Sequence, residues 1–201
     1  ARKVPEFLGW CQDAGVQVVT LYLLSSDNLT GRDSAELEEL FGIIADLAEV
    51  LGEQPDWRIQ HVGSGDGLPE SLCSAIRRAE ESTRDHTGLH VNLAVGYGGR
   101  SEITAAVRSI IEKHQRDGGN LDSLAERLTP DQIGEHLWTG GQPDPDLVIR
   151  TSGEQRLSDF MIWQSAHSEF YFVDALYPDL REVDLLRALR DYSRRNRRYG
   201  S

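Results

Sequence analysis

The sequence predicts an α/β protein in which a mostly parallel sheet is covered by helices. Runs rich in β-branched and apolar residues, typical of strands, alternate with segments whose apolar residues recur at helical spacing; the strand-like runs are 16–24, 57–62, 89–95, 146–150 and 170–173. Such alternation is typical of parallel sheets, because crossover helices return the chain to the same edge. No linker, internal repeat or low-complexity stretch divides the 201 residues, which favours one domain over residues 1–201.

The composition is that of a globular protein, with 39% hydrophobic and 27% charged residues. A chain of this length buries roughly 70% of its unfolded surface, enough for a core without disulfides. The only two cysteines, Cys11 and Cys73, lack metal-binding spacing, and a reducing cytoplasm is expected. A net charge of −12 disfavours general nucleic-acid binding. Because the single methionine is Met161, we expect the chain to be part of a longer protein.

The first elements in order are a helix, a strand, a loop and a second helix. Phe7, Leu8 and Cys11 share one face of a helix that ends at Gly15. The apolar run that follows is continuous enough to predict a buried parallel strand, and it leads into a polar loop, SSDNLTGR. Asp33 or Ser34 then caps a helix with a long apolar stripe, made of Leu37, Leu40, Phe41, Ile44, Leu47 and Leu51.

The remaining elements follow the same alternation. The second strand ends in a glycine-rich turn, and Pro69 opens a helix that faces inward through Leu72, Ile76 and Ala79. The third strand runs into GYGGR, which lacks the Rossmann spacing and is typical of a tight strand-to-helix turn. A helix of about 15 residues, a short helix from Thr129-Pro130 and a last helix over 183–195 complete the pattern.

Ligands of open parallel sheets bind beyond the carboxyl ends of the strands, so functional residues are expected in the loops there. The chain has no P-loop, no GxSxG elbow and no HExxH motif, which excludes those enzyme classes. After the fourth strand stands RTSGEQRLS, which places Arg150 and Arg156 beside two hydroxyls and a glycine. Arginine forks bind phosphate oxygens, but either arginine could equally pair with Glu154, and the residues alone leave both interpretations open.

Five segments together resemble the cis-prenyltransferases, the undecaprenyl-diphosphate-synthase family; they are SSDNL, GYGGR, DLVIRTSGEQRLS, WQSAHSEFYF and RRYG. The resemblance covers essentially the whole chain and is strongest towards the actinobacterial short-chain branch. It implies a single domain with a six-stranded, mostly parallel sheet, working as a homodimer in the cytoplasm with transient membrane contact. It also implies a Mg²⁺-dependent transferase that condenses isopentenyl diphosphate with an allylic diphosphate, giving a short, farnesyl-type product.

The resemblance also implies roles for individual residues. Ser25 and Asn28 would lie beside the reacting carbons, with Asn28 in the proton-transfer step. Arg150, Arg156 and Ser158 would hold isopentenyl diphosphate, and Glu169 would help to hold magnesium. Further substrate-binding residues are implied at Ser26, Asp27, Leu29, Arg32, Leu157, Arg198 and Gly200, of which Arg198 and Gly200 would reach across the dimer. The apolar stripe after Asp33 would line the tunnel for the growing chain.

The chain departs from the family pattern at several points. The N-terminal DGNxRW motif with its magnesium-binding aspartate is missing, which raises the alternative of a non-catalytic subunit in a heteromeric prenyltransferase. Leu29 stands where the family has Trp, and Arg32 follows Asn28 by four residues instead of three. A short segment between Arg32 and the second strand favours a short product over a long-chain, decaprenyl or undecaprenyl, one. A third hypothesis for the function is a protein that binds a phosphate-containing ligand without prenyltransferase activity.

Overall fold

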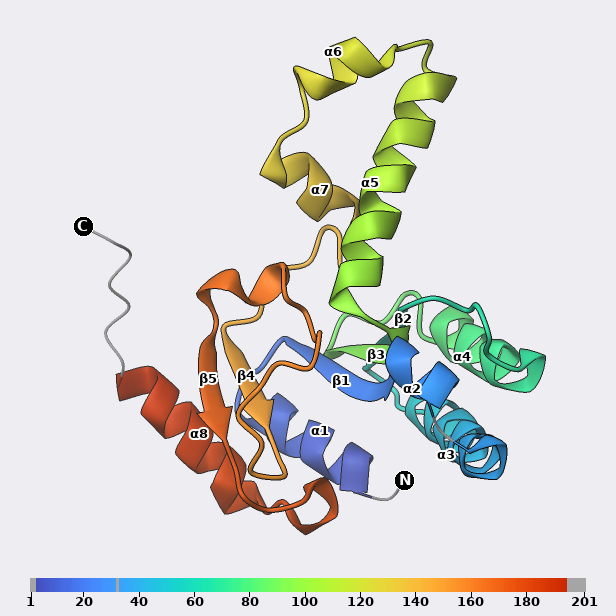
Figure 1. Ribbon diagram of the computed structural model, residues 1–201. Helices are drawn as coiled ribbons and strands as arrows, with labels where there is room; N and C mark the ends of the chain where they lie inside the picture. The colour runs from blue at the N-terminus through green and yellow to red at the C-terminus, as the bar shows by residue number, and fades with distance from the viewer. Residues whose placement is uncertain (1–2, 32, 195–201) are drawn as a thin grey trace. The chain divides into compact units, whose positions relative to one another are not determined.

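The computed structural model describes residues 3–31 and 33–194, which form two compact units, Ala1–Gln142 and Pro143–Ser201 (Figure 1). The first contains a three-stranded sheet with most of the helices, and the second contains a two-stranded sheet with the last long helix.

The sheet of the first unit is parallel, with strand order β1 (Val18–Ser25), β3 (His90–Tyr97) and β2 (Arg58–Val62). The central strand β3 is buried from Val91 onwards, because it has a neighbour on each side. The prediction of parallel strands is confirmed. The prediction of a fully buried first strand was wrong: only Leu21 and Leu24 of β1 are buried, since β1 lies at the edge of this sheet and pairs with β3 alone.

Four helices of this unit follow the sequence pattern closely. They are α1 (Lys3–Asp13), α3 (Ser34–Gly52), α4 (Glu70–Ser82) and α5 (Gly99–Arg116). Asp33 caps α3 by accepting a hydrogen bond from the Ala35 N–H at 2.9 Å. Helices α3 and α4 pack on each other and on β2. The carboxyl half of the α3 stripe is fully buried, whereas Leu37, Leu40 and Phe41 at its amino half are half-buried.

Three short helices complete the first unit. The segment predicted as a polar loop after β1 is the helix α2 (Ser26–Gly31), because the Ser25 hydroxyl accepts a hydrogen bond from the Asn28 N–H and so starts a turn. Helix α6 (Leu121–Ala125) follows Gly118 and Gly119, between two predicted helices where the sequence indicated a glycine-rich loop. Helix α7 (Pro130–His136) begins as predicted, with a capping box between Thr129 and Gln132. Both α6 and α7 contact α5.

A row of polar side chains crosses one face of the three-stranded sheet. Thr20, Asn92 and Gln60 occupy matching register positions on β1, β3 and β2. The fully buried Asn92 amide donates to the Thr20 hydroxyl at 3.0 Å and to Gln142 Oε1 at 2.7 Å, and Gln142 Nε2 donates to Gln60 Oε1 and Asn92 Oδ1 at 3.1 Å each. These bonds compensate for burying the amides and hold Gln142 on the sheet.

The second unit is built on β4 (Leu147–Arg150) and β5 (Glu169–Phe172), a parallel pair. The 3₁₀ turns η1 (Gln164–His167) and η2 (Tyr177–Asp179) and the helix α8 (Glu182–Arg194) follow. The six-stranded sheet implied by the family resemblance was wrong for the described residues, whose strands number five in two sheets. The chain's own apolar runs predicted those five strands, whereas the sixth came from the family pattern.

No helix in the described ranges is long and apolar enough to cross a membrane.

Candidate functional site

The loop after β4 brings together the two arginines that the sequence singled out. Glu154 accepts from both guanidinium groups: its Oε2 takes Arg150 Nη2 and its Oε1 takes Arg156 Nη2 at 2.6 Å. Arg150 Nη1 also donates to the Arg156 carbonyl and, at 2.9 Å, to the Ser158 hydroxyl. The ion pairs that the sequence left open are therefore present. These ion pairs leave N–H donors of both arginines available to a ligand, because each guanidinium has five N–H donors.

Burial differs between these three charged side chains. The Arg150 side chain is 23% exposed, that of Glu154 is 41% and that of Arg156 is 66%. The Arg150 side chain is therefore partly buried in the loop with which it forms hydrogen bonds, while the Arg156 side chain is exposed to solvent. Ser158 is exposed and the side chain of Leu157 is half-buried. A dissolved anion would meet Arg156 first and reach the Arg150 and Ser158 groups beside it.

The backbone of this loop is unusual. Ser152, Ser158, Asp159 and Met161 all have positive φ, at 78°, 50°, 61° and 46°, as does Gly153. Left-handed backbone at a residue other than glycine costs of order 1–3 kcal/mol and clusters at ligand-binding sites. The loop is anchored by hydrogen bonds from the Ser152 N–H to Ala175 O and from the Gly153 N–H to Val173 O. Serine and methionine carry no sequence signal for this conformation and aspartate only a weak one, so the sequence could not predict it.

Glu169 lies at the other end of the two-stranded sheet. It pairs with Leu147 at the start of β4, whereas Arg150 at the end of β4 pairs with Phe172. Three residues of strand separate the two positions by roughly 10 Å. The backbone positions of Glu169 and Arg150 therefore lie at opposite ends of the paired strands. Its predicted magnesium role stays a prediction.

The remaining predicted catalytic residues lie in the first unit, at the carboxyl end of β1. Ser25 ends the strand, and its hydroxyl accepts from the Asn28 N–H at 3.1 Å. Ser26, Asn28 and Leu29 are half-buried on α2, while Asp27 is exposed. A methyl carbon of Leu29 lies 4.0 Å from where a side chain on Gly67 would begin, so α2 lies against the turn after β2. Arg32, Arg198 and Gly200 lie outside the described residues.

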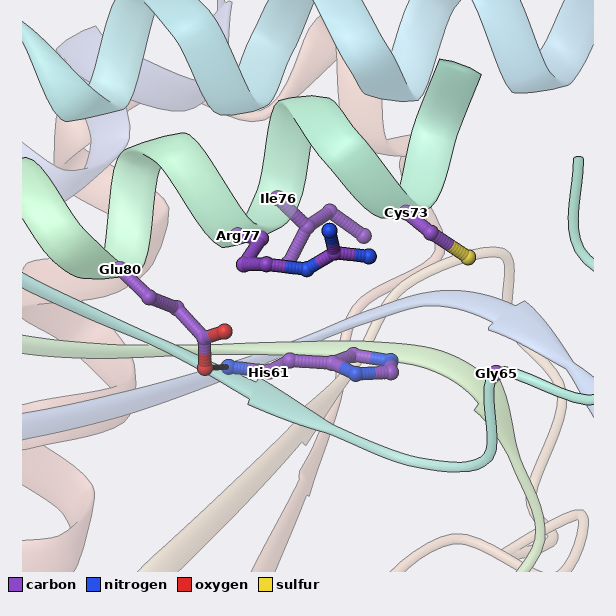
Figure 2. Close-up of a pocket in the computed structure, with 6 residues that line it drawn as sticks. All are labelled: His61, Gly65, Cys73, Ile76, Arg77 and Glu80. Atoms are coloured by element: carbon purple, nitrogen blue, oxygen red, sulfur yellow. Dashed lines mark hydrogen bonds between the residues drawn. The ribbon is translucent and has the colours of Figure 1, made fainter. Parts of the chain in front are cut away.

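A separate pocket of about 220 Å³ lies between β2 and α4 (Figure 2). It is lined by His61, Gly65, Cys73, Ile76, Arg77 and Glu80. The Glu80 carboxylate accepts from the His61 N–H at 2.7 Å, and the His61 ring bonds the Val95 carbonyl at 2.9 Å. His61 is therefore held at its main-chain N–H by the Glu80 side chain and at its ring by the Val95 carbonyl.

Metal-binding residues do not gather anywhere in the described ranges. Across residues 3–31 and 33–194, no group of three or more His, Cys, Asp or Glu side chains could hold a metal ion.

The fold and this loop define the chain as an α/β protein with a cationic loop at the carboxyl end of a parallel strand. Residues 1–200 match the family model described as "Putative undecaprenyl diphosphate synthase". The chain belongs to this family of prenyltransferases, and the resemblance found in its motifs is confirmed.

Individual relatives resemble the chain over its full length. It is 53% identical to "Isoprenyl transferase 1" of Streptomyces avermitilis, across all of this chain and 78% of that protein. It is 50% identical to the "Short-chain Z-isoprenyl diphosphate synthase" of Mycobacterium bovis, across all of this chain and 76% of that protein.

Solved structures agree with this assignment. Lavandulyl diphosphate synthase from Lavandula x intermedia, crystallised with dimethylallyl diphosphate, superposes with a TM-score of 0.87 at 36% identity, covering 96% of this chain and 83% of that one. A probable undecaprenyl diphosphate synthase from Campylobacter jejuni gives a TM-score of 0.85 at 25% identity, over 100% of this chain and 91% of the other.

Proposed function

We propose that this protein is a Z-prenyl diphosphate synthase that condenses isopentenyl diphosphate with an allylic diphosphate to give a short product. The observation that carries the proposal is the arginine loop after β4, where two guanidinium groups share the Glu154 carboxylate and Arg150 also donates to the Ser158 hydroxyl. Membership of the prenyltransferase family supports it. So do the names of relatives about half identical to the chain, which describe short-chain Z-isoprenyl diphosphate synthases.

In this proposal the diphosphate group of isopentenyl diphosphate is bound by Arg150, Arg156 and Ser158. Preorganised guanidinium groups suit this task, because their paired N–H donors match phosphate oxygens. The allylic C–O bond breaks and its diphosphate leaves. The double bond of isopentenyl diphosphate forms a new C–C bond to that allylic carbon, and loss of a proton from the five-carbon unit then forms the new double bond. Ser25 and Asn28 stand beside the reacting carbons, with Asn28 taking part in the proton transfer. Further substrate contacts come from Ser26, Asp27, Leu29, Arg32, Leu157, Arg198 and Gly200.

The α3 stripe is the proposed wall for the growing chain. Leu37, Leu40 and Phe41 are half-buried although their side chains are apolar. A prenyl chain against them would bury that surface, which favours binding by about 25 cal/mol for each Å² removed from water.

Magnesium and the assembly belong to the proposal through the family resemblance. Glu169 would contribute one carboxylate to Mg²⁺, and no step above depends on the metal. A homodimer in the cytoplasm, with transient contact at the membrane, remains a prediction, as does the single domain formed by residues 1–201.

The test is a product assay on the full-length protein. Incubation with radiolabelled isopentenyl diphosphate, an allylic primer and magnesium should give butanol-extractable label, and chromatography of the dephosphorylated product should show a short chain. Label no higher than a blank without protein would reject the synthase. The same assay separates the alternatives: a long product indicates a long-chain synthase. Label that appears only when a second prenyltransferase subunit is added indicates a non-catalytic partner.

A further inference from the structure

We infer that Glu154 is a positioning residue for diphosphate binding, a role that rests on the proposed function of the loop. Its two carboxylate oxygens are divided between the arginines, with Oε2 on Arg150 and Oε1 on Arg156. One rigid group thus sets the distance and the orientation between two long, flexible cations. Diphosphate binding then requires less ordering of these side chains, since their geometry is already set.

The hydrogen-bond donors of the two arginines support this role. Within the described part of the chain, Arg156 donates through Nη2 to Glu154 alone, which leaves four of its five N–H groups for a ligand. Arg150 donates three, to Glu154, the Arg156 carbonyl and Ser158, and so keeps two. Glu154 therefore orients both guanidinium groups while most of their donors stay available.

Stability does not explain the arrangement. Arg156 and Glu154 are 66% and 41% exposed, and ion pairs this open add little to folding. The backbone near them is strained instead, with left-handed Ser152 two residues before Glu154. A loop that accepts strain to hold a carboxylate between two cations is organised for binding.

A Glu154 side chain that blocks the diphosphate site would have the opposite effect on binding. If Glu154 occupied the place of the diphosphate and had to leave, its removal would tighten binding. Removing its negative charge would also raise the net charge of the three side chains from +1 to +2, which by itself attracts an anion. A positioning residue predicts weaker binding in spite of that gain.

The experiment measures Glu154→Ala and Glu154→Gln in the full-length protein. Glutamine keeps the length of the side chain but accepts through one oxygen only, so it can orient one arginine and not both. We expect the KM for isopentenyl diphosphate to rise roughly 10-fold in the alanine variant, from the cost of ordering two arginines, and by less in the glutamine variant. We expect kcat and the KM for the allylic primer to stay within about twofold, because the change acts on one ligand only.

A matched control comes from another exposed ion pair. Glu49 on α3 pairs with Arg78 on α4 at 2.6 Å and has 56% of its side chain exposed. Glu49→Ala and Glu49→Gln remove the same charge from the molecule outside the arginine loop. Both should leave the KM for isopentenyl diphosphate within about twofold, since exposed pairs of this kind contribute little.

A second measurement is independent of turnover. Calorimetric titration with inorganic pyrophosphate should show weaker binding in both Glu154 variants and unchanged binding in the Glu49 variants. An unchanged or lower KM together with unchanged or tighter pyrophosphate binding would overturn the positioning role. Wild-type protein that makes no prenyl product would instead reject the proposed function, whatever the Glu154 variants show.

Discussion

Arg156→Ala separates ligand binding from folding more cleanly than any other change in the loop. The Arg156 side chain is 66% exposed, and within the described residues its guanidinium donates only to Glu154. Its removal therefore takes away an exposed ion pair, worth 0–1 kcal/mol to folding. For a chain of this size that corresponds to a fall of at most about 4 °C in the melting temperature.

The effect on binding should be much larger. A hydrogen bond to a charged group contributes about 1.5–3 kcal/mol. Loss of one such bond to a diphosphate raises the KM for isopentenyl diphosphate by roughly 10- to 150-fold. Arg156→Lys keeps the charge and loses the planar fork, so an intermediate rise is expected.

Arg150→Ala should behave differently. Arg150 is 23% exposed and braces the loop through the Arg156 carbonyl and the Ser158 hydroxyl. Its loss should raise the KM and also lower the free energy of unfolding by about 1–3 kcal/mol, because the loop loses internal hydrogen bonds.

Initial-rate kinetics with labelled isopentenyl diphosphate at saturating primer, together with thermal melting, measure both effects. Arg78→Ala on α4 removes the partner of a similarly exposed ion pair and should leave the KM unchanged. A KM within twofold of wild type for Arg156→Ala would contradict a role of Arg156 in diphosphate binding, as would a loss of stability as large as that of Arg150→Ala.

Three further predictions concern folding of the first unit. Asn92→Leu removes the hydrogen bonds that a fully buried amide makes with Thr20 and Gln142, and should cost about 3 kcal/mol in urea denaturation. A loss below about 1 kcal/mol would show that the polar row adapts freely. Burial lowers the pKa of His90 in the folded protein. As the pH falls through the ordinary value of about 6.5, the unfolded chain therefore binds a proton that the folded protein does not, and the free energy of unfolding should decrease below that pH. His90→Gln should flatten this dependence, and an unchanged slope would contradict it. Gly63→Ala places a methyl group 2.0 Å from the Val95 carbonyl oxygen at a φ of 145°, and should lower the free energy of unfolding by about 2 kcal/mol or more. Gly42 lies in the middle of α3, and a side chain there would meet nothing within 4 Å. Gly42→Ala should therefore raise the free energy of unfolding by about 0.5–1 kcal/mol. Equal effects of the two substitutions on denaturant unfolding would show that the position of Gly63 does not require glycine.

The sequence alone determined most of the secondary structure. The helix that starts after Asp33 and the strand that ends in GYGGR follow from local rules, namely a side chain that caps the first turn and a run of apolar residues. The family followed from motifs over the whole chain. Each of these properties is encoded in neighbouring residues, so no contact between distant segments is needed to predict it.

The helix at 26–31 shows where local patterns were insufficient. Its polar residues and its glycine indicated a loop, yet the bond from the Asn28 N–H to the Ser25 hydroxyl starts a helix there. The exposure of β1 was also missed, because a strand pattern does not show how many neighbours the strand will have.

Only the tertiary structure decided how the charges at the candidate site are arranged. The sequence placed Arg150, Glu154 and Arg156 within seven residues and left two interpretations open. The structure divides one carboxylate between both arginines and holds the loop in left-handed backbone at Ser152 and Ser158. Long side chains reach many partners from one backbone position, and non-glycine residues adopt positive φ only where surrounding contacts compensate for the strain. Both outcomes depend on the packed loop as a whole, which is why residue order indicated the charged groups but not their geometry.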